Sequence, residues 1–436
     1  MIESHQSNFL LVFSLKYSIS WRLLNLFSER PLVNWNAFRY QDYRILWLIL
    51  MTSGMATWLR ILCFSQWLLD ETGSAFFVGL IGIVQLVVQF PSTLWAGTLA
   101  DRKNRKFLLG ISHGITLTTL GILAILNFNG VLTPSLIYVG IAITAGSQML
   151  GSPSRAALIP EIFPEKEMMA AASTDTASQN LAAILGPLLF ALIAVNFGLT
   201  EVFFVCVLLT LPGTIGPLAL SISGNSKETG QISKGQIAET IEGLNYVRKH
   251  PILPGLFLLD AAITTASFYR EILPVIALGL FAAGASATGL LGSANSAGAI
   301  IGGFVALMLS RARAKGMVVL YASLAYGALL LAFGFANSLV MGLILIGLLG
   351  AADSVTVAVR VTTVMLTTPD QMRGRAFALM FLAAQTANNI GTIWVGAWAG
   401  IIGAPNTMIM GGVISIMMTL IILLAWEPIR KYRSED

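Results

Sequence analysis

Long apolar segments recur along the 436-residue chain and constrain its fold more than any other feature. Each is about 20 residues long, the length that an α-helix needs to cross roughly 30 Å of hydrocarbon. Since only 11% of the residues are charged, against roughly 25% in soluble domains, a water-soluble fold is excluded. The sequence predicts an all-α membrane protein with twelve transmembrane helices, at approximately residues 45–69, 76–99, 107–127, 133–152, 169–195, 201–221, 253–280, 286–309, 317–336, 338–359, 376–400 and 404–425.

Basic residues indicate how these helices are oriented. Every Lys and Arg except Arg60, Arg270 and Arg360 lies on one side of the predicted membrane, in a terminus or near a loop. Short basic loops resist translocation, so this side is predicted to be cytoplasmic. An even number of spans then places both termini on that side. We expect a multi-pass protein of the inner or plasma membrane with both termini cytoplasmic.

A hydrophilic stretch divides the spans six and six, which suggests that a six-helix unit was duplicated. Its second part has a helical apolar pattern, so we expect a linker that carries a surface helix. Two parallel six-span halves are typical of transporters. The expected order is an N-terminal extension, a six-helix bundle, a cytoplasmic linker, a second six-helix bundle and a cytoplasmic tail, at residues 1–41, 42–221, 222–251, 252–427 and 428–436. For the extension, an interfacial helix and an unordered segment are equally good interpretations.

No pattern in the sequence indicates an enzyme, a cofactor or a metal centre. A Gly-x-x-x-x-Gly-Lys-Ser/Thr phosphate loop is absent, and His5, His113 and His250 are isolated from other potential metal ligands. Cys63 and Cys206 lie in apolar segments and are interpreted as core residues. The net charge of +5 is scattered among loops, so nucleic acid is not an expected partner.

A densely charged turn follows the second span. Residues 97–106 read Gly-Thr-Leu-Ala-Asp-Arg-Lys-Asn-Arg-Lys. Charges at this density belong in water, because an ionised side chain at the bilayer centre costs at least about 2.5 kcal/mol. Gly97 would let helix backbones approach closely, and Asp101 could accept hydrogen bonds from the N-terminus of a neighbouring helix.

This turn resembles the signature of the major facilitator superfamily, Gly-x-Leu-Ala-Asp-Arg-x-x-Arg-Lys/Arg between the second and third spans. More narrowly, the chain is similar to the branch that includes the enterobactin exporter and related drug:proton antiporters. That branch shows Phe-Arg-x-x-x-(Phe/Tyr)-Arg-x-Leu-Trp at the first span, which matches residues 38–47, and Thr-Pro-Asp-x-Met-Arg-Gly-Arg before the eleventh, which matches residues 368–375. The resemblance covers roughly residues 38–425. It implies the major facilitator fold, with two pseudo-symmetric six-helix halves and transport by alternating access.

The resemblance also implies that the charged turn acts as a conformational latch. In the family its acid faces the start of span eleven, and the contact favours the outward-facing state. The alternative is that these charges serve only as a topology signal. The candidate latch residues are Gly97, Asp101, Arg102, Arg105, Lys106, Arg373 and Arg375.

Six charged residues lie in spans one, seven and ten or at the inner end of span ten. Such residues are functional candidates by default, because a charge in the membrane requires a partner or water. In the resembled family spans one, seven and ten line the central cavity, which would bring these six side chains around one aqueous path. They are Arg60, Asp260, Arg270, Glu271, Asp353 and Arg360.

Asp260 or Asp353 is the candidate for proton coupling, since a carboxyl in a cavity of low dielectric can load and release a proton near neutral pH. Asp353 could instead bond to Arg360, which lies on the same helical face at about 10 Å by helix rise. Arg60 would hold an anionic substrate group or pair with Glu271.

The neighbours Arg270 and Glu271 point to different faces of a helix, so structural pairing with other spans and substrate contact are equally open for them. Asn388 and Asn389 in span eleven are candidates for substrate contact or for polar packing between helices.

Three functions are compatible with these features. The leading hypothesis is a monomeric secondary transporter that exports an amphipathic small molecule, such as a siderophore or a drug-like compound, in exchange for protons. Import of a small metabolite by proton symport is the first alternative, and a non-transporting membrane scaffold or sensor on the same fold is the second. The expected partners are the substrate, a coupling proton and the lipid bilayer.

Overall fold

A computed structural model describes the backbone of residues 35–225 and 236–433, and the side chains of all of these except residues 35–36, 93–102 and 236–240. Most of the expected N-terminal extension, residues 1–41, therefore lies outside the described residues. The described chain begins with a short 3-10 helix, η1 (Trp35–Arg39). Within this part of the chain every regular element is helical.

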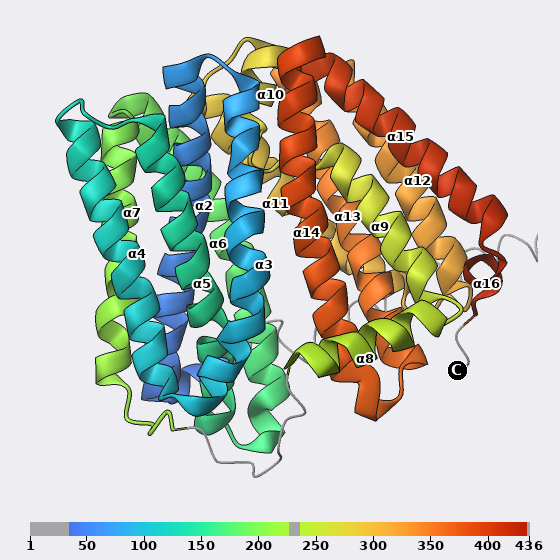
Figure 1. Ribbon diagram of the computed structural model, residues 1–436, viewed down its shortest axis with the longest axis horizontal. Helices are drawn as coiled ribbons and strands as arrows, with labels where there is room; N and C mark the ends of the chain where they lie inside the picture. The colour runs from blue at the N-terminus through green and yellow to red at the C-terminus, as the bar shows by residue number, and fades with distance from the viewer. Residues whose placement is uncertain (1–34, 226–235, 434–436) are drawn as a thin grey trace, which may run out of the picture.

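The first half of the chain forms a bundle of six long helices, which we call the N-half (Figure 1). Two short 3-10 helices, η2 (Glu165–Glu167) and η3 (Gly216–Ala219), follow the fourth and the sixth of them. The six helices are α2 (Gln41–Thr72), α3 (Ala75–Arg102), α4 (Arg105–Phe128), α5 (Pro134–Ile162), α6 (Met168–Asn196) and α7 (Leu199–Ile215).

The second half begins with α8 (Gln236–Lys249), a surface helix that packs against the start of the eleventh span. A short helix, α16 (Glu427–Lys431), ends the described chain. Between them lies the C-half, made of α9 (Leu253–Ser267), α10 (Leu273–Phe281), α11 (Ala285–Leu309), α12 (Lys315–Gly334), α13 (Leu339–Thr367), α14 (Asp370–Ile402) and α15 (Ala404–Ala425).

The helices account for all twelve predicted spans. By length and composition, ten described helices could cross a membrane. The eleventh predicted span is the 33-residue helix α14, and the seventh corresponds to α9 and α10 together. The predicted all-α membrane protein with two six-helix halves is confirmed.

The prediction that span seven is one continuous helix over residues 253–280 is wrong. The helix is interrupted between Ser267 and Leu273, and Pro274 occupies the first turn of the second piece. Proline lacks the backbone N–H and its ring clashes with the carbonyl four residues earlier, here that of Arg270. Non-helical backbone at membrane depth is tolerated where it lines a cavity.

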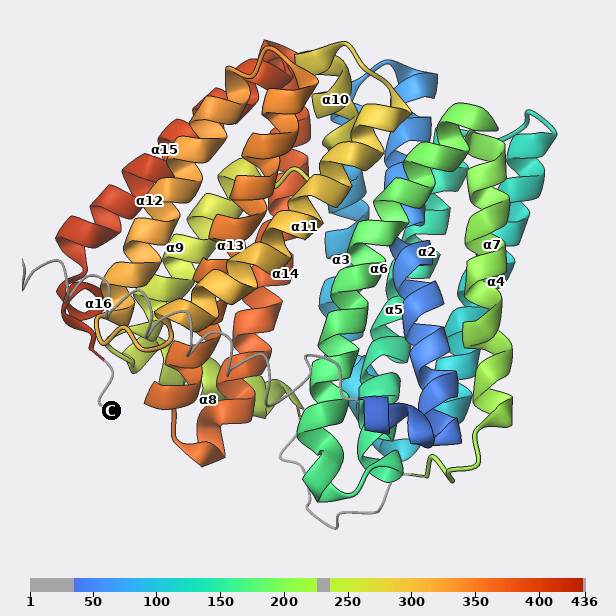
Figure 2. The same ribbon diagram turned by 180° about the vertical axis from the view of Figure 1, so that it is seen from behind.

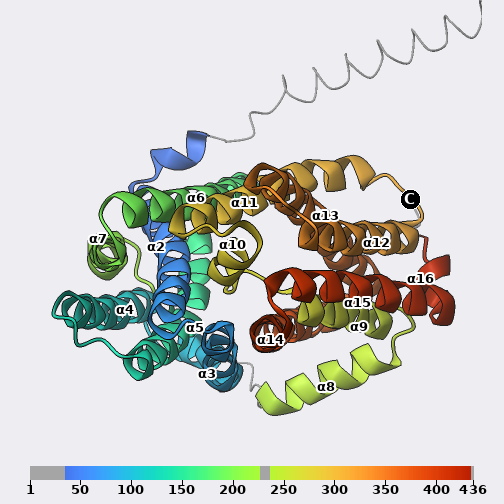
Figure 3. The ribbon, with the colours of Figure 1, turned by 90° about the horizontal axis from the view of Figure 1, so that it is seen from above.

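The two halves meet at one end of the molecule and diverge toward the other (Figures 1 and 2). We call these the α10 end and the α8 end, after the helices that lie there. Both η1 and α16 lie toward the α8 end (Figure 2), which the charge distribution predicts to be cytoplasmic. Seen from above, α10 lies near the centre, between the two halves (Figure 3).

Close helix contacts join the halves toward the α10 end. Helix α3 packs on α14, and α6 packs on α11. A Cβ on Gly79 of α3 would lie 2.9 Å from the Cα of Gly396 on α14, so only residues without side chains permit this approach. A hydrogen bond of 3.2 Å from Thr288 to Gln66 adds a polar link between α11 and α2.

The hydrophobic core has the same asymmetry. The largest cluster of buried apolar side chains takes members from both halves, for example Leu68 and Phe203 with Ile276 and Ile346. The smaller clusters toward the α8 end each belong to one half, such as the one around Leu46 and the clusters of the C-half. Burial of apolar surface therefore joins the halves at the α10 end.

Candidate functional site

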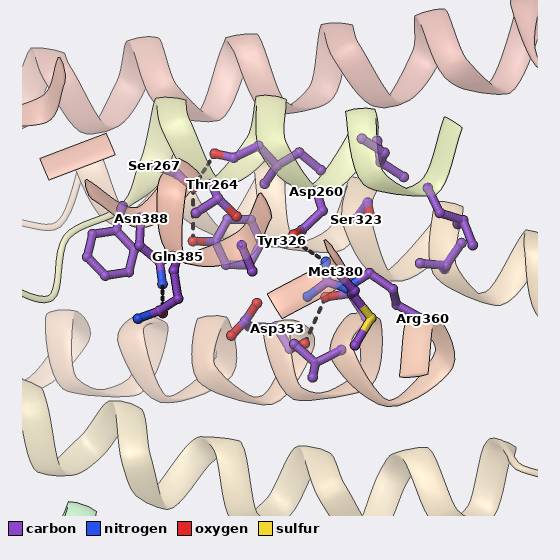
Figure 4. Close-up of a pocket in the computed structure, with 18 of the residues that line it drawn as sticks. Asp260, Thr264, Ser267, Ser323, Tyr326, Asp353, Arg360, Met380, Gln385 and Asn388 are labelled. Atoms are coloured by element: carbon purple, nitrogen blue, oxygen red, sulfur yellow. Dashed lines mark hydrogen bonds and ion pairs between the residues drawn. The ribbon is translucent and has the colours of Figure 1, made fainter. Parts of the chain in front are cut away.

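Three neighbouring cavities follow one another through the interior. The C-half cavity, about 410 Å³, lies among α9, α11, α12, α13 and α14 (Figure 4). The interface cavity, about 160 Å³, lies between α2, α3 and α5 on one side and α14 with the break in span seven on the other. The N-half cavity, about 270 Å³, lies among α2, α4, α5, α6 and α7. Arg270 lines the first two cavities and Arg60 lines the last two, so the three cavities are adjacent.

A buried ion pair closes one side of the C-half cavity. Asp260 of α9 pairs with Arg360 of α13, and both side chains line the cavity (Figure 4). The alternative prediction of a bond between Arg360 and Asp353 is therefore wrong for this conformation. The two residues on α13 are separated by about two helical turns, whereas Asp260 approaches Arg360 from the adjacent helix.

Asp353 lines the same cavity as Arg270 but forms no ion pair with it. Its side chain is exposed, and among the described residues no ion pair engages its carboxylate. Apart from the backbone bonds of α13, the hydrogen bond described at this residue goes to its backbone carbonyl, which accepts from the Thr356 hydroxyl at 2.7 Å. The carboxylate is thus available to a proton or to a cargo molecule.

Two tyrosines line the wall of the C-half cavity near Asp353. The Tyr326 hydroxyl lies 3.1 Å from the hydroxyl of Ser267, and the Tyr269 hydroxyl accepts a hydrogen bond of 2.6 Å from Asn295. Both phenolic groups are therefore held by neighbouring helices. They give this part of the cavity a fixed polar lining.

Arg60 is buried on α2, with 9% of its surface exposed. Its guanidinium donates a hydrogen bond of 3.4 Å to the Gln148 side chain of α5. Glu271, the other partner that the sequence suggested, accepts a hydrogen bond of 3.2 Å from the Thr392 hydroxyl. The predicted ion pair between Arg60 and Glu271 is absent among the described contacts, so its alternative, an anionic substrate group, stays a prediction.

Arg270 lies on the break in span seven and reaches across the interface between the halves. Its guanidinium carbon is 4.9 Å from the ring centroid of Trp58 on α2 and 5.7 Å from that of Phe268. Both distances are within the range of cation–π attraction. The sequence drew attention to Arg270 but not to Trp58, whose position depends on how the halves dock.

The two asparagines of α14 have different surroundings. Asn388 lines the C-half and interface cavities and donates to Gln385 on its own helix at 3.2 Å. Asn389 is buried and donates to Gln89 of α3 at 3.1 Å. Asn389 therefore links the two halves at the interface cavity, while Asn388 lines both that cavity and the C-half cavity.

The candidate latch residues of the N-half are only partly described. The side chains of Gly97, Asp101 and Arg102 lie outside the described residues. Arg105 forms an ion pair of 3.0 Å with Glu161 of α5. Lys106 donates to the backbone carbonyl of residue 220 at 2.9 Å. Both contacts lie within the N-half, so the latch stays a prediction.

The candidate latch residues of the C-half pair with other acids in this conformation. Arg373 pairs with Asp370 of its own helix at 2.6 Å. Arg375 pairs with Glu242 of α8 at 2.9 Å, and this contact fixes the surface helix to α14. Glu242 was not among the sequence candidates.

Sequence reasoning missed one buried ion pair in the N-half. Arg155 of α5 binds Asp175 of α6 through two hydrogen bonds of 2.8 Å each. The sequence assigned Arg155 to a loop, but α5 continues beyond it to Ile162. Asp175 falls inside the fifth predicted span, so the search that found Asp260 could also have found Asp175.

No metal site accompanies these charges in the described part of the chain, where no group of three or more His, Cys, Asp or Glu side chains could hold a metal ion. The site consists of polar and charged side chains around adjacent cavities between two helical bundles. Twelve spans in two halves with a polar interior at their interface define a major facilitator transporter.

Solved structures share this fold. A nucleoside transporter, NupG, superposes with a TM-score of 0.71 at 13% identity, covering 88% of this chain and 100% of that chain. A D-xylose–proton symporter superposes with a TM-score of 0.70 at 13% identity, covering 89% of this chain and 98% of that chain.

Residues 32–436 match the family model of transmembrane secretion effectors, and the chain belongs to this family of the major facilitator superfamily. It is 24% identical over 432 residues to the enterobactin exporter EntS of Shigella boydii, covering 95% of this chain and 96% of that protein. Against the enterobactin exporter EntS of Escherichia coli O81 the identity is 25% over 375 residues, covering 83% of each. The protein belongs to a transporter family and is not an enzyme.

Proposed function

We propose that this protein is a monomer of the inner membrane, with both termini cytoplasmic, that exports an amphipathic small molecule in exchange for protons. The observation that carries the proposal is the unpaired carboxylate of Asp353 in the C-half cavity of a major facilitator transporter. The similarity to enterobactin exporters supports the direction of transport. It also supports a siderophore or a compound of similar size and polarity as the cargo.

The docking of the halves at the α10 end supports loading from the cytoplasm. In this conformation glycine contacts and a shared apolar core hold the α10 end together. The cargo would enter from the α8 end and reach the adjacent cavities. A second conformation, closed at the α8 end, would then release it to the outside.

Asp353 is the better of the two sequence candidates for proton coupling. Asp260 neutralises Arg360, and protonating Asp260 would leave a buried cation without its counter-charge. Asp353 can be protonated without breaking a pair. We assign the coupling proton to Asp353, which would load it from outside and release it to the cytoplasm.

The charged turn after span two would stabilise the second conformation. Arg375, now paired with Glu242, would exchange this acid for Asp101 when the α8 end closes. In this account Arg375 pairs with Glu242 in the described conformation and with Asp101 in the conformation that is closed at the α8 end.

Transport into inside-out vesicles tests the proposal. In such vesicles an acidic lumen drives protons toward the bath, so an exporter accumulates added enterobactin inside. We expect accumulation that requires the acidic lumen, is lost in Asp353→Asn and is kept in Asp353→Glu. Accumulation only in right-side-out vesicles would favour import by symport. Gradient-independent accumulation would contradict proton coupling.

A further inference from the structure

Two cations in the central cavities, Arg60 and Arg270, form no ion pair among the described residues, although Arg270 shares its cavities with Asp353 and Glu271. In contrast, Arg155 and Arg360 each bind an acid. Arg60 is nine-tenths buried, and its one side-chain contact is a neutral amide at 3.4 Å. A buried cation without a counter-charge is unfavourable, so a site of this kind is completed by an anion.

Both arginines line the interface cavity, and they come from opposite halves. Among the described residues, Glu271 is the one acid that lines this cavity. Its carboxylate accepts a hydrogen bond from the Thr392 hydroxyl. Two cations therefore face one carboxylate. The rest of the polar lining is neutral and rich in amides, from Gln85, Gln89, Gln148, Gln385, Asn388 and Asn389.

The surroundings of Arg270 indicate the shape of the anion. Its guanidinium lies over the rings of Trp58 and Phe268, and the side chain stays exposed in the cavity. Stacking occupies the flat faces of a guanidinium and leaves the N–H groups at its edge free. These groups match a planar carboxylate, which they bind in a bidentate manner. Phe268 in the interface cavity and Trp58 in the adjoining N-half cavity offer apolar walls for an aromatic group attached to that carboxylate.

The volume of the interface cavity limits the size of the ligand group that it can hold. Drug-sized ligands occupy pockets of roughly 300–1,000 Å³, and the interface cavity is smaller, at about 160 Å³. It has room for the anionic end of a molecule. The remainder would extend into the C-half cavity or the N-half cavity, which adjoin it at Arg270 and at Arg60.

We propose that the interface cavity binds the anionic end of the cargo, a planar aromatic carboxylate held between Arg60 and Arg270 beside Phe268. This inference rests on the proposed function only in treating the ligand as cargo. Because the two arginines belong to different halves, such an anion links the halves while it is bound.

Direct binding to the purified full-length protein in detergent tests the inference. The probes are 2-naphthoate and its neutral isostere 2-naphthamide, followed by isothermal titration calorimetry. We expect naphthoate to bind at least about tenfold more tightly than naphthamide, the size of effect that a charge-assisted hydrogen bond produces. Arg60→Gln and Arg270→Gln should each remove most of this preference. Arg270→Lys keeps the charge without the planar fork and should retain part of it.

Arg311→Gln is the matched control, since Arg311 is exposed in the turn between α11 and α12. It should leave both affinities unchanged. Equal binding of the two probes to the wild-type protein would overturn the inference even if a variant failed to fold. An unchanged preference in both glutamine variants would overturn it as well. If naphthoate binds but proton-driven transport is absent, the proposed function is contradicted and this inference is not. If proton-driven transport occurs but the protein binds both probes equally, this inference is contradicted and the proposed function is not.

Discussion

The arginines inside this membrane protein fall into two groups. Arg155 and Arg360 are each fixed by an acid from a neighbouring helix, one pair in each half. Among the described residues, Arg60 and Arg270 form no ion pair; Arg60 donates to an amide and Arg270 lies over aromatic rings. Paired charges hold helices together, whereas unpaired charges at a cavity are available to a ligand.

Removing one member of the buried pair should destabilise the fold. Asp260→Asn leaves the Arg360 guanidinium without its counter-charge, which should cost about 3–5 kcal/mol of stability. The charge-swapped variant Asp260→Arg with Arg360→Asp should recover part of this loss. Thermal unfolding in detergent measures both. Asp353→Asn is the matched comparison and should change the unfolding temperature little, so an equal loss in Asp260→Asn and Asp353→Asn would contradict the assignment.

The sequence shows which charges lie in the membrane but not which of them pair. Apolar length is a local property, so Arg60, Asp260 and Asp353 could be placed in spans from the sequence alone. The partner of Arg360 depends on how α9 and α13 pack, which is set by side chains far apart in the sequence. For the same reason the contact between Arg270 and Trp58 could not be predicted.

At the scale of elements, the break in span seven decides where Arg270 lies. Pro274 is visible in the sequence, but a proline alone does not determine whether a helix is interrupted. Pro187 and Pro212 lie inside α6 and α7, which continue through them. In span seven the residues before the proline are charged and face cavities, so their backbone can leave the helix there.

Restoring the helix should move Arg270. Pro274→Ala regains a backbone N–H and removes the ring clash, so α9 and α10 should join more often. Hydrogen exchange of the amides between Ser267 and Leu273 should slow, and naphthoate affinity should fall as Arg270 leaves Trp58. Pro212→Ala, in a helix that is already continuous, is the control. Unchanged exchange in Pro274→Ala would show that the proline does not maintain the break.

The junction between α8 and α9 should be sensitive to acid. The Nδ1 atom of His250 accepts hydrogen bonds of 3.2 Å from the backbone N–H groups of Ile252 and Leu253, which requires an unprotonated nitrogen. Burial lowers the pKa of His250 below its usual value of about 6.5. The stabilisation is therefore present above the unfolded pKa and is lost as the pH falls through the lower folded pKa.

Hydrogen exchange at the start of α9 measures this effect. After correction for intrinsic rates, protection should decrease between neutral and mildly acidic pH. His250→Asn keeps an acceptor that does not titrate, so it should remove the pH dependence. A wild-type protein with pH-independent protection would contradict the role of His250.

At the scale of the whole molecule, the conformation depends on which end joins the halves. The predicted spans and their orientation follow from hydropathy and charge, and both are local patterns. Which end is closed depends on contacts such as Gly79 with Gly396, where two helices from different halves approach. A single glycine in an apolar span does not show which helix of the other half it will contact.

Bulk at this contact should open the α10 end. Gly79→Leu places a side chain against the backbone of Gly396 and should favour the conformation closed at the α8 end. A cysteine introduced at Gln385, which lines two of the cavities, reports this change by labelling with an impermeant maleimide from outside. We expect faster labelling than in the parent. Gly121→Leu, where an added Cβ meets nothing within 4 Å, is the control. Equal labelling in both variants would contradict the role of this contact in closing the α10 end.

The central claim is that cargo leaves in exchange for a proton carried by Asp353. The most direct measurement is the pH inside proteoliposomes in the inside-out orientation, followed with a trapped dye while cargo is added to the bath. Exchange predicts that the lumen becomes more alkaline as cargo enters, and that Asp353→Asn abolishes this change. Cargo entry with a constant lumen pH, or the same alkalinisation in Asp353→Asn, would contradict the account.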